Sequence, residues 1–200
     1  GVPQGVWYRL ETRAIDGSGS EIASASGSAN WGVGIRILCI GQSNMVGTGA
    51  NAAPYVTAHD LAANWSNDQH WEHLVDPYDD GGSSADPDYD GGASYSMIPT
   101  LANDLIAEMN IPIGFVPCAL GGTSIDEWQP GHSSGLYDNS VAEAQTVGGV
   151  ELIIMLQGES DIGDTRTQYK TDLQTMYSQY TTDLYADIPL VICQIGRNTA

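Results

Sequence analysis

The amino-acid sequence predicts an α/β protein, built as a three-layer, doubly wound sandwich with a mostly parallel central sheet and preceded by a β-hairpin. Apolar segments rich in β-branched residues, typical of strands buried on both faces, alternate along the chain with longer segments of helical periodicity. Strands joined through helices form right-handed crossovers, which place helices on both faces of a parallel sheet. The predicted strands cover residues 35–40, 113–119, 150–156 and 188–195, and the predicted helices cover 96–110, 139–147 and 165–186.

The charge of the chain limits the classes of partner that it can bind. Its 25 acidic and 6 basic residues give a formal net charge of −19. Such a field repels phosphate backbones and anionic lipid surfaces, so we expect no nucleic acid and no membrane as partner, and a neutral substrate. No apolar run reaches the roughly 18 residues that a membrane helix needs. The three cysteines, Cys39, Cys118 and Cys193, lie in apolar runs and are interpreted as small buried hydrophobic residues.

Residues 1–32 are expected to form a unit of their own, ahead of the main domain at residues 33–200. Partial alternation of apolar and polar residues over 6–15, a polar turn at 16–20 and a second short strand at 21–25 predict a β-hairpin. A lone two-stranded hairpin is marginally stable in water. We therefore expect the hairpin to pack on the main domain or to be the end of a preceding β module.

The segment between the first predicted strand and the first predicted helix is loop-like, with one helical turn expected near residues 58–65. Its acidic tract, residues 76–92, contains DPDYDG, which imitates the start of a calcium loop, but Met97 stands where the twelfth position requires a bidentate Glu. A calcium loop and a solvated acidic loop remain as alternatives. His70 and His73 share a helical face in this interpretation, and we expect surface residues there rather than a metal site.

Polar turns that carry glycine follow three of the predicted strands at their carboxyl ends. Because these ends lie at one edge of a parallel sheet, the turns can converge in a single crevice. Acyl transfer requires a nucleophilic hydroxyl and hydrogen-bond donors directed at the oxyanion that develops. Ser43 offers the hydroxyl. The backbone N–H groups at Gly121 and Gly122 have no Cβ atom in the way, and the amide of Gln157 is a further neutral donor.

Three sequence blocks stand at these strand ends in a fixed order: GQSNM with a following glycine, GGTSIDEW, and QGESD. In these blocks the chain resembles the SGNH (GDSL-like) hydrolase superfamily, and within it the branch of sialate O-acetylesterases and related carbohydrate acetyl esterases. The resemblance covers about residues 33–197 and implies a flavodoxin-like SGNH fold. It also implies Ser43 as nucleophile, with the backbone N–H groups of Ser43 and of Gly121 or Gly122 in the oxyanion hole.

The third oxyanion donor departs from the pattern of the superfamily. An Asn of a G-x-N-D block supplies it there, whereas this chain has Ser160 at that position. We expect Gln157 to replace this donor and Glu159 to orient the loop from behind. The other residues expected to support or border the pocket are Gln42, Asn44, Trp128 and His132.

The general base is the largest departure from the family pattern. The resemblance implies an Asp-x-x-His pair close to the carboxyl end of the domain, and this sequence contains no Asp-x-x-His. None of the four histidines, His59, His70, His73 and His132, stands at the implied position. Two explanations remain: a fragment whose further segment carries the Asp and His, which we favour, or a degenerate domain that binds carbohydrate without hydrolysing it.

The expected function is that of a carbohydrate O-acetyl esterase, which hydrolyses acetyl esters on a sugar or polysaccharide through a serine and without a cofactor. The alternative is a catalytically incomplete carbohydrate-binding or structural module of a larger surface or virion assembly. A lipase or thioesterase is disfavoured by the acidity of the chain and by the lack of a long apolar lid segment. We expect an extracellular, periplasmic or particle-surface location and a place within a larger multidomain protein.

Overall fold

A six-stranded sheet in the order β5-β4-β6-β3-β7-β8 forms the centre of the molecule. The computed structural model describes residues 3, 5–47, 57–78, 95–185 and 187–193. Neighbouring strands are parallel except at one edge, where β5 runs antiparallel to β4. The strands are β3 (Ile35–Gly41), β4 (Ala62–Trp65), β5 (Trp71–His73), β6 (Ile113–Pro117), β7 (Leu152–Leu156) and β8 (Leu190–Ile192).

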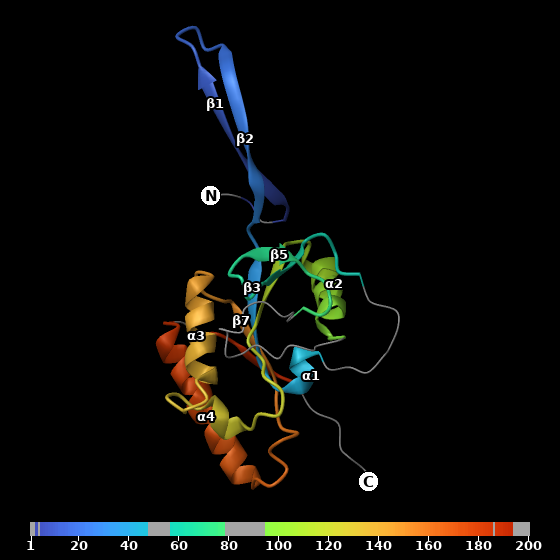
Figure 1. Cartoon of the computed structure of the whole chain (residues 1–200), viewed down its shortest axis with the longest axis vertical. Helices are drawn as coiled ribbons and strands as arrows, with labels where there is room; N and C mark the ends of the chain where they lie inside the picture. Colours follow the sequence, from blue (N-terminus) through green and yellow to red (C-terminus); the bar gives the residue numbers. More distant parts are fainter. Residues whose placement is uncertain (1–2, 4, 48–56, 79–94, 186, 194–200) are drawn as a thin grey trace.

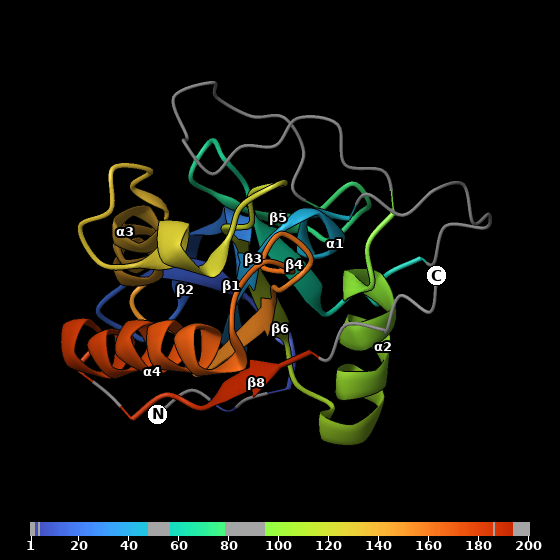
Figure 2. The ribbon, with the colours of Figure 1, turned by 90° about the horizontal axis from the view of Figure 1, so that it is seen from below.

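Helices cover both faces of this sheet (Figure 2). α2 (Ile98–Met109) lies on one face, and α3 (Leu136–Thr146) and α4 (Arg166–Asp183) lie on the other. The predicted three-layer, doubly wound sandwich is therefore confirmed. Each of the three predicted helices is present, with ends that lie within one turn of the expected ones.

The central strand β3 divides the core into two halves. Side chains of successive strand residues point to opposite faces of a sheet. Ile37 and Cys39 accordingly join the apolar cluster under α2, whereas Leu38 and Ile40 join the cluster under α3 and α4. All four side chains are buried. This burial on both faces is why the strand reads as an uninterrupted apolar run.

The first two strands form a separate antiparallel hairpin, which we call the arm: β1 (Trp7–Ile15) and β2 (Glu21–Gly32). Figure 1 shows the arm extending away from the six-stranded sheet, beyond the end at which β3 begins. Its turn is closed by Asp16, whose carboxylate accepts hydrogen bonds from the backbone N–H groups of Ser18 and Ser20. The Ser18 hydroxyl donates to the same carboxylate and, with these N–H groups, lowers the pKa of Asp16.

Three details differ from the sequence-based expectations. The helical turn expected near residues 58–65 is wrong: residues 62–65 form β4, because their backbone pairs with β6 on one side and β5 on the other. His70 and His73 therefore lie at a strand and not on a helical face. β2 continues to Gly32, well beyond the expected end. Most of the acidic tract lies outside the described residues, and so does the end of the last predicted strand.

Within the described residues, no helix is both long and apolar enough to span a membrane.

Candidate active site

Ser43 lies at the carboxyl end of β3, where the chain turns sharply. Gly41 has φ +129°, and a Cβ atom there would lie 2.1 Å from the carbonyl oxygen of Leu156. Only glycine allows β3 and β7 to approach so closely at this point. The next residue, Gln42, donates its backbone N–H to the Leu156 carbonyl at 3.0 Å. Ser43 then begins the short helix α1 (Ser43–Val46), with its side chain half-buried at the edge of the sheet.

A buried pair of glutamine side chains joins the three strand-end turns. The amide nitrogen of Gln157 donates to the Gln42 side-chain oxygen at 3.1 Å and to the Thr123 carbonyl at 2.6 Å. Gln42 Oε1 also accepts from the backbone N–H of Ser160 at 3.2 Å. Gln42 and Gln157 are 2% and 3% exposed, so these bonds are shielded from water. The turns after β3, β6 and β7 thus meet at one edge of the sheet.

Asp161 fixes the same junction from the side of β7. Its carboxylate accepts from the Gln157 amide at 2.8 Å and from the backbone N–H of Ile125 at 2.7 Å. On the other side, the Leu120 N–H donates to the Gly41 carbonyl at 3.0 Å. The turn after β6, which contains Gly121 and Gly122, is therefore fixed by hydrogen bonds at both of its ends.

Within that turn, the backbone is open on its outer side. Gly122 is exposed, has φ +78°, and would meet no atom within 4 Å if it carried a Cβ. The segment that follows, η1 (Ile125–Trp128), begins with a capping box in which the Ser124 and Glu127 side chains bond each other's backbone N–H groups. A rigid turn with an accessible backbone at Gly122 fits the role of an oxyanion donor.

Glu159 and Tyr169 complete the surroundings of the turn after β7. Asn44 donates a short hydrogen bond to Glu159 Oε1, which links the residue after Ser43 to this turn. The Tyr169 hydroxyl donates to the Gln157 carbonyl at 3.0 Å. Burial, with the nearby charges of Asp161 and Glu159, raises the pKa of Tyr169 to about 12. Tyr169 is therefore a neutral donor throughout the physiological pH range.

The predicted site residues fall into two groups. Ser43, Gln42, Asn44, Glu159, Gln157 and the glycine turn are brought together. Trp128 is not part of a pocket wall, because it is fully buried in the core and its indole N–H donates to the Thr123 hydroxyl at 3.2 Å. The His132 ring forms hydrogen bonds with the hydroxyl and the backbone N–H of Ser134, which are contacts within its own loop.

The hydrogen bonds of Gln157 correct its predicted role. An oxyanion donor must direct an N–H group at the substrate. The Gln157 amide nitrogen instead donates to three oxygen atoms inside the protein, so its contacts are those of a positioning residue. Among the described residues, its side-chain oxygen and Glu159 Oε2 are buried acceptors without a hydrogen-bond partner.

Three residues of the site were missed at the sequence level: Thr123, Asp161 and Tyr169. Asp161 ends the QGESD block, and its place after a strand was the available signal. Thr123 acts through its carbonyl, which no side-chain pattern reveals. Tyr169 stands on the buried stripe of α4 and reads as a core residue.

The four histidines contact other groups. His59 Nδ1 accepts from the Leu61 N–H, and His70 bonds the Ser66 hydroxyl. His73 faces the Asp60 carboxylate at 4.0 Å. The described part of the chain shows no cluster of three or more His, Cys, Asp or Glu side chains that could hold a metal ion.

Known proteins share the family and the fold of this chain. A family model described as carbohydrate esterase, sialic acid-specific acetylesterase, matches residues 35–200. A probable carbohydrate esterase of Arabidopsis thaliana is 46% identical over 56 residues, which are 26% of this chain and 21% of that protein. The matched segment of the chain thus spans about a fifth of the length of this curated relative.

Two solved structures share the fold. The X-ray structure of the same Arabidopsis protein superimposes with a TM-score of 0.67 at 22% identity, covering 82% of this chain and 75% of that one. The crystal structure of a carbohydrate acetylesterase from Xanthomonas citri gives a TM-score of 0.61 at 18% identity, covering 96% of this chain and 54% of that one.

Proposed function

Because the chain belongs to the carbohydrate esterase family of sialic acid-specific acetylesterases, we propose that it is a carbohydrate O-acetyl esterase with Ser43 as its nucleophile. The observation that carries this proposal is the meeting of three strand-end turns around the buried Gln42–Gln157 pair. This junction holds the Ser43 turn and the Gly121–Gly122 turn in a fixed relation. A nucleophile and an oxyanion site must be pre-positioned in this way.

The proposed reaction has two steps. The Ser43 oxygen attacks the acetyl carbonyl carbon while its proton passes to a base, and the resulting oxyanion accepts hydrogen bonds from the backbone N–H groups of Ser43 and Gly122. Collapse of this intermediate breaks the ester bond, and the sugar oxygen leaves with a proton as a free hydroxyl. Water then hydrolyses the acetyl-Ser43 ester and releases acetate. Each oxyanion donor contributes about 2.7–4 kcal/mol to the transition state.

The charge of the chain favours a neutral acetylated polysaccharide as substrate over an acetylated sialic acid, which carries a carboxylate. The net charge of −19 opposes the approach of anions. Arg36 lies near the start of β3, at the end of the strand that is remote from Ser43. Its guanidinium forms an ion pair with the Glu151 carboxylate at 2.7 Å. It therefore offers no counter-charge to a substrate at the Ser43 edge.

The test is covalent labelling together with release of acetate. The full-length protein should react with a fluorophosphonate probe and release acetate from acetylated xylan faster than from acetylated sialic acid. Ser43→Ala should abolish labelling and lower acetate release by at least about 1,000-fold, because the nucleophile is lost. Ser133→Ala, which removes an exposed hydroxyl from a loop, is the matched control and should behave as the unaltered chain.

A second candidate function is carbohydrate binding without hydrolysis. One observation favours it: the histidines that could take the Ser43 proton contact other groups. A full-length protein that is not labelled, releases no acetate and still binds acetylated xylan would support this second function and contradict the esterase.

A further inference from the structure

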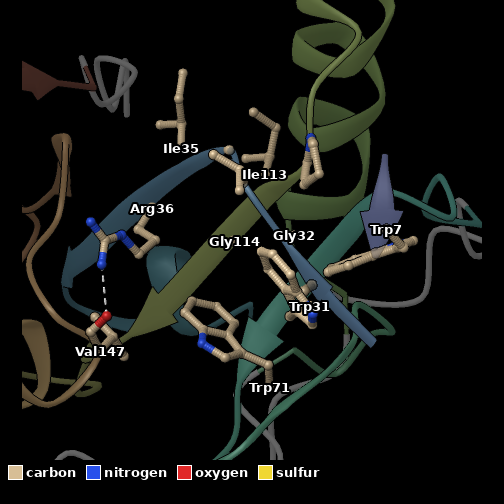
Figure 3. A pocket seen from close by; sticks show the side chains of 13 residues that line it. Trp7, Trp31, Gly32, Ile35, Arg36, Trp71, Ile113, Gly114 and Val147 are labelled. Carbon is tan, nitrogen blue, oxygen red and sulfur yellow. Dashed lines mark hydrogen bonds between the residues drawn. The ribbon is translucent and has the colours of Figure 1, made fainter. Parts of the chain in front are cut away.

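A cavity lies at the amino ends of β3 and β6, where the arm joins the α/β domain (Figure 3). Its volume is about 370 Å³. The indole rings of Trp7, Trp31 and Trp71 lie on one side of it, and Arg36 lies on the other. A volume of this size and a largely apolar, aromatic lining are typical of sites for small ligands.

The tryptophan rings of this cavity are held in place by glycine. A Cβ atom on Gly114 would lie 2.6 Å from the Trp71 ring, and one on Gly32 would lie 2.9 Å from the Trp7 ring. The rings therefore pack directly on the backbone of β6 and β2. Trp7 is fixed further by its indole N–H, which donates to the Asp60 carbonyl at 2.7 Å. A ligand would meet a surface whose shape exists before binding.

The cavity is separate from the Ser43 site. It is lined by Ile35 and Arg36 at the start of β3 and by Ile113 at the start of β6. Ser43 follows the other end of β3, so the length of the strand puts about 20 Å between the two sites. In Figure 1 the arm and α1 accordingly lie at opposite ends of the sheet.

Among the described residues, Arg36 is the one charged residue that lines the cavity, and its charge is neutralised by an ion pair. The Arg36 guanidinium donates to both carboxylate oxygens of Glu151 and to the Val147 carbonyl at 2.7 Å. Its charge is therefore compensated, and the chain around it carries a net charge of −19. Anionic ligands are repelled by this field, and a cation would meet no unpaired carboxylate among the residues that line the cavity.

We infer that this cavity is a second carbohydrate-binding site, which holds one or two rings of a neutral polysaccharide while Ser43 acts elsewhere on the same polymer. Indole faces offer a flat apolar surface with a polar edge, which suits the C–H face and the hydroxyl rim of a pyranose. Trp31 and Trp71 are 42% and 38% exposed, so part of each ring is accessible to a ligand. Tyr8 packs against the Trp31 ring and Trp65 against the Trp71 ring, which fixes both indoles in place. Binding here does not depend on hydrolysis at Ser43.

The direct test follows the indole N–H signals of the five tryptophans by NMR in ¹⁵N-labelled protein, with xylohexaose, cellohexaose or mannohexaose as the probe. At least one of these neutral oligosaccharides should shift the Trp31 and Trp71 signals at millimolar concentration, and should leave the buried Trp128 signal in place. No shift with any of the three would overturn the inference. Equal or larger shifts with trigalacturonate would also overturn it, because that probe is anionic.

Variants separate the cavity from the Ser43 site. Trp31→Ala should weaken binding of the responding hexasaccharide by about tenfold or more, whereas Tyr185→Ala, which removes a ring that is 91% exposed elsewhere, should not. Neither readout requires hydrolysis, so a failed esterase proposal would not affect this result. A sugar-independent dimer that Trp31→Ala converts to a monomer, measured by sedimentation, would identify a second copy as the occupant and contradict the inference.

Discussion

At the scale of single residues, Gln157 was expected to donate a hydrogen bond to the oxyanion. Its buried amide instead donates to groups inside the protein and so holds the turns of the site together. The Gln157 amide nitrogen contacts three acceptors, which lie in three different turns. Gln42 Oε1 also accepts from the Ser160 N–H, and the Asp161 carboxylate also accepts from the Ile125 N–H. A buried acceptor that loses its donor costs about 1–3 kcal/mol. The site therefore depends on Gln157 for its shape before any chemistry takes place.

We predict that Gln157→Ala lowers the free energy of unfolding by about 1–3 kcal/mol, because the Thr123 carbonyl and the Asp161 carboxylate lose their donor. Urea unfolding followed by circular dichroism measures the change. Gln168→Ala is the matched control: its amide bonds Asp172 at an exposed position, and its loss should stay within about 0.5 kcal/mol. Equal effects of the two substitutions would contradict the positioning role.

The raised pKa of Tyr169 makes the stability of the folded chain fall at alkaline pH. Its pKa is about 12 in the folded chain against 10.0 for an ordinary tyrosine, so the folded state holds the phenol proton more tightly than the unfolded state. This contribution to stability is complete below pH 10 and is lost as the pH rises towards 12. We predict that Tyr169→Phe loses less stability than the unaltered chain between these two values. Urea unfolding across the range tests this, and Tyr185→Phe should show no such difference.

At the scale of elements, the strands and turns that make the site were predictable because local patterns specify them. β3, β6 and β7 are buried on both faces and appear as apolar runs, and the glycines that end them mark the turns. β4 was not predictable: Ala62–Trp65 contains no strand pattern, and its conformation depends on pairing with β6. The groups that accept hydrogen bonds from Gln157 could not be predicted for the same reason, because they lie far from it in the sequence.

The turn that presents Ser43 depends on glycine at position 41. We predict that Gly41→Ala destabilises the chain by more than about 1–3 kcal/mol, because its φ of +129° is strained for alanine and the added Cβ meets the Leu156 carbonyl. Labelling of Ser43 should fall as the turn moves. Thermal unfolding and fluorophosphonate labelling measure both effects.

Gly17→Ala is the control for this substitution. Gly17 lies in the turn of the arm, where an added Cβ would meet no atom within 4 Å. It should change neither the melting temperature nor the labelling. A stable, fully labelled Gly41→Ala chain would show that the close approach of β3 and β7 is not required.

At the scale of the whole molecule, charge rather than packing is the unusual feature. A net charge of −19 on 200 residues places many carboxylates near one another in the compact state. The ion pairs among the described residues are mostly at exposed positions, where each contributes little. Self-repulsion therefore opposes folding, and it is greatest at low ionic strength, where the screening length is longest.

We predict that NaCl stabilises this chain at neutral pH. Raising the ionic strength from about 0.01 to about 0.15 M shortens the screening length from about 30 to about 8 Å, which removes most repulsion between distant carboxylates. A gain of about 1 kcal/mol raises the melting temperature by about 2–4 °C for a chain of this size. LiCl, NaCl and KCl should give equal shifts at equal ionic strength, measured by calorimetry, because screening does not depend on the identity of the cation. A larger shift with one cation would instead indicate a specific site, and a fall in melting temperature would show that the ion pairs outweigh the repulsion.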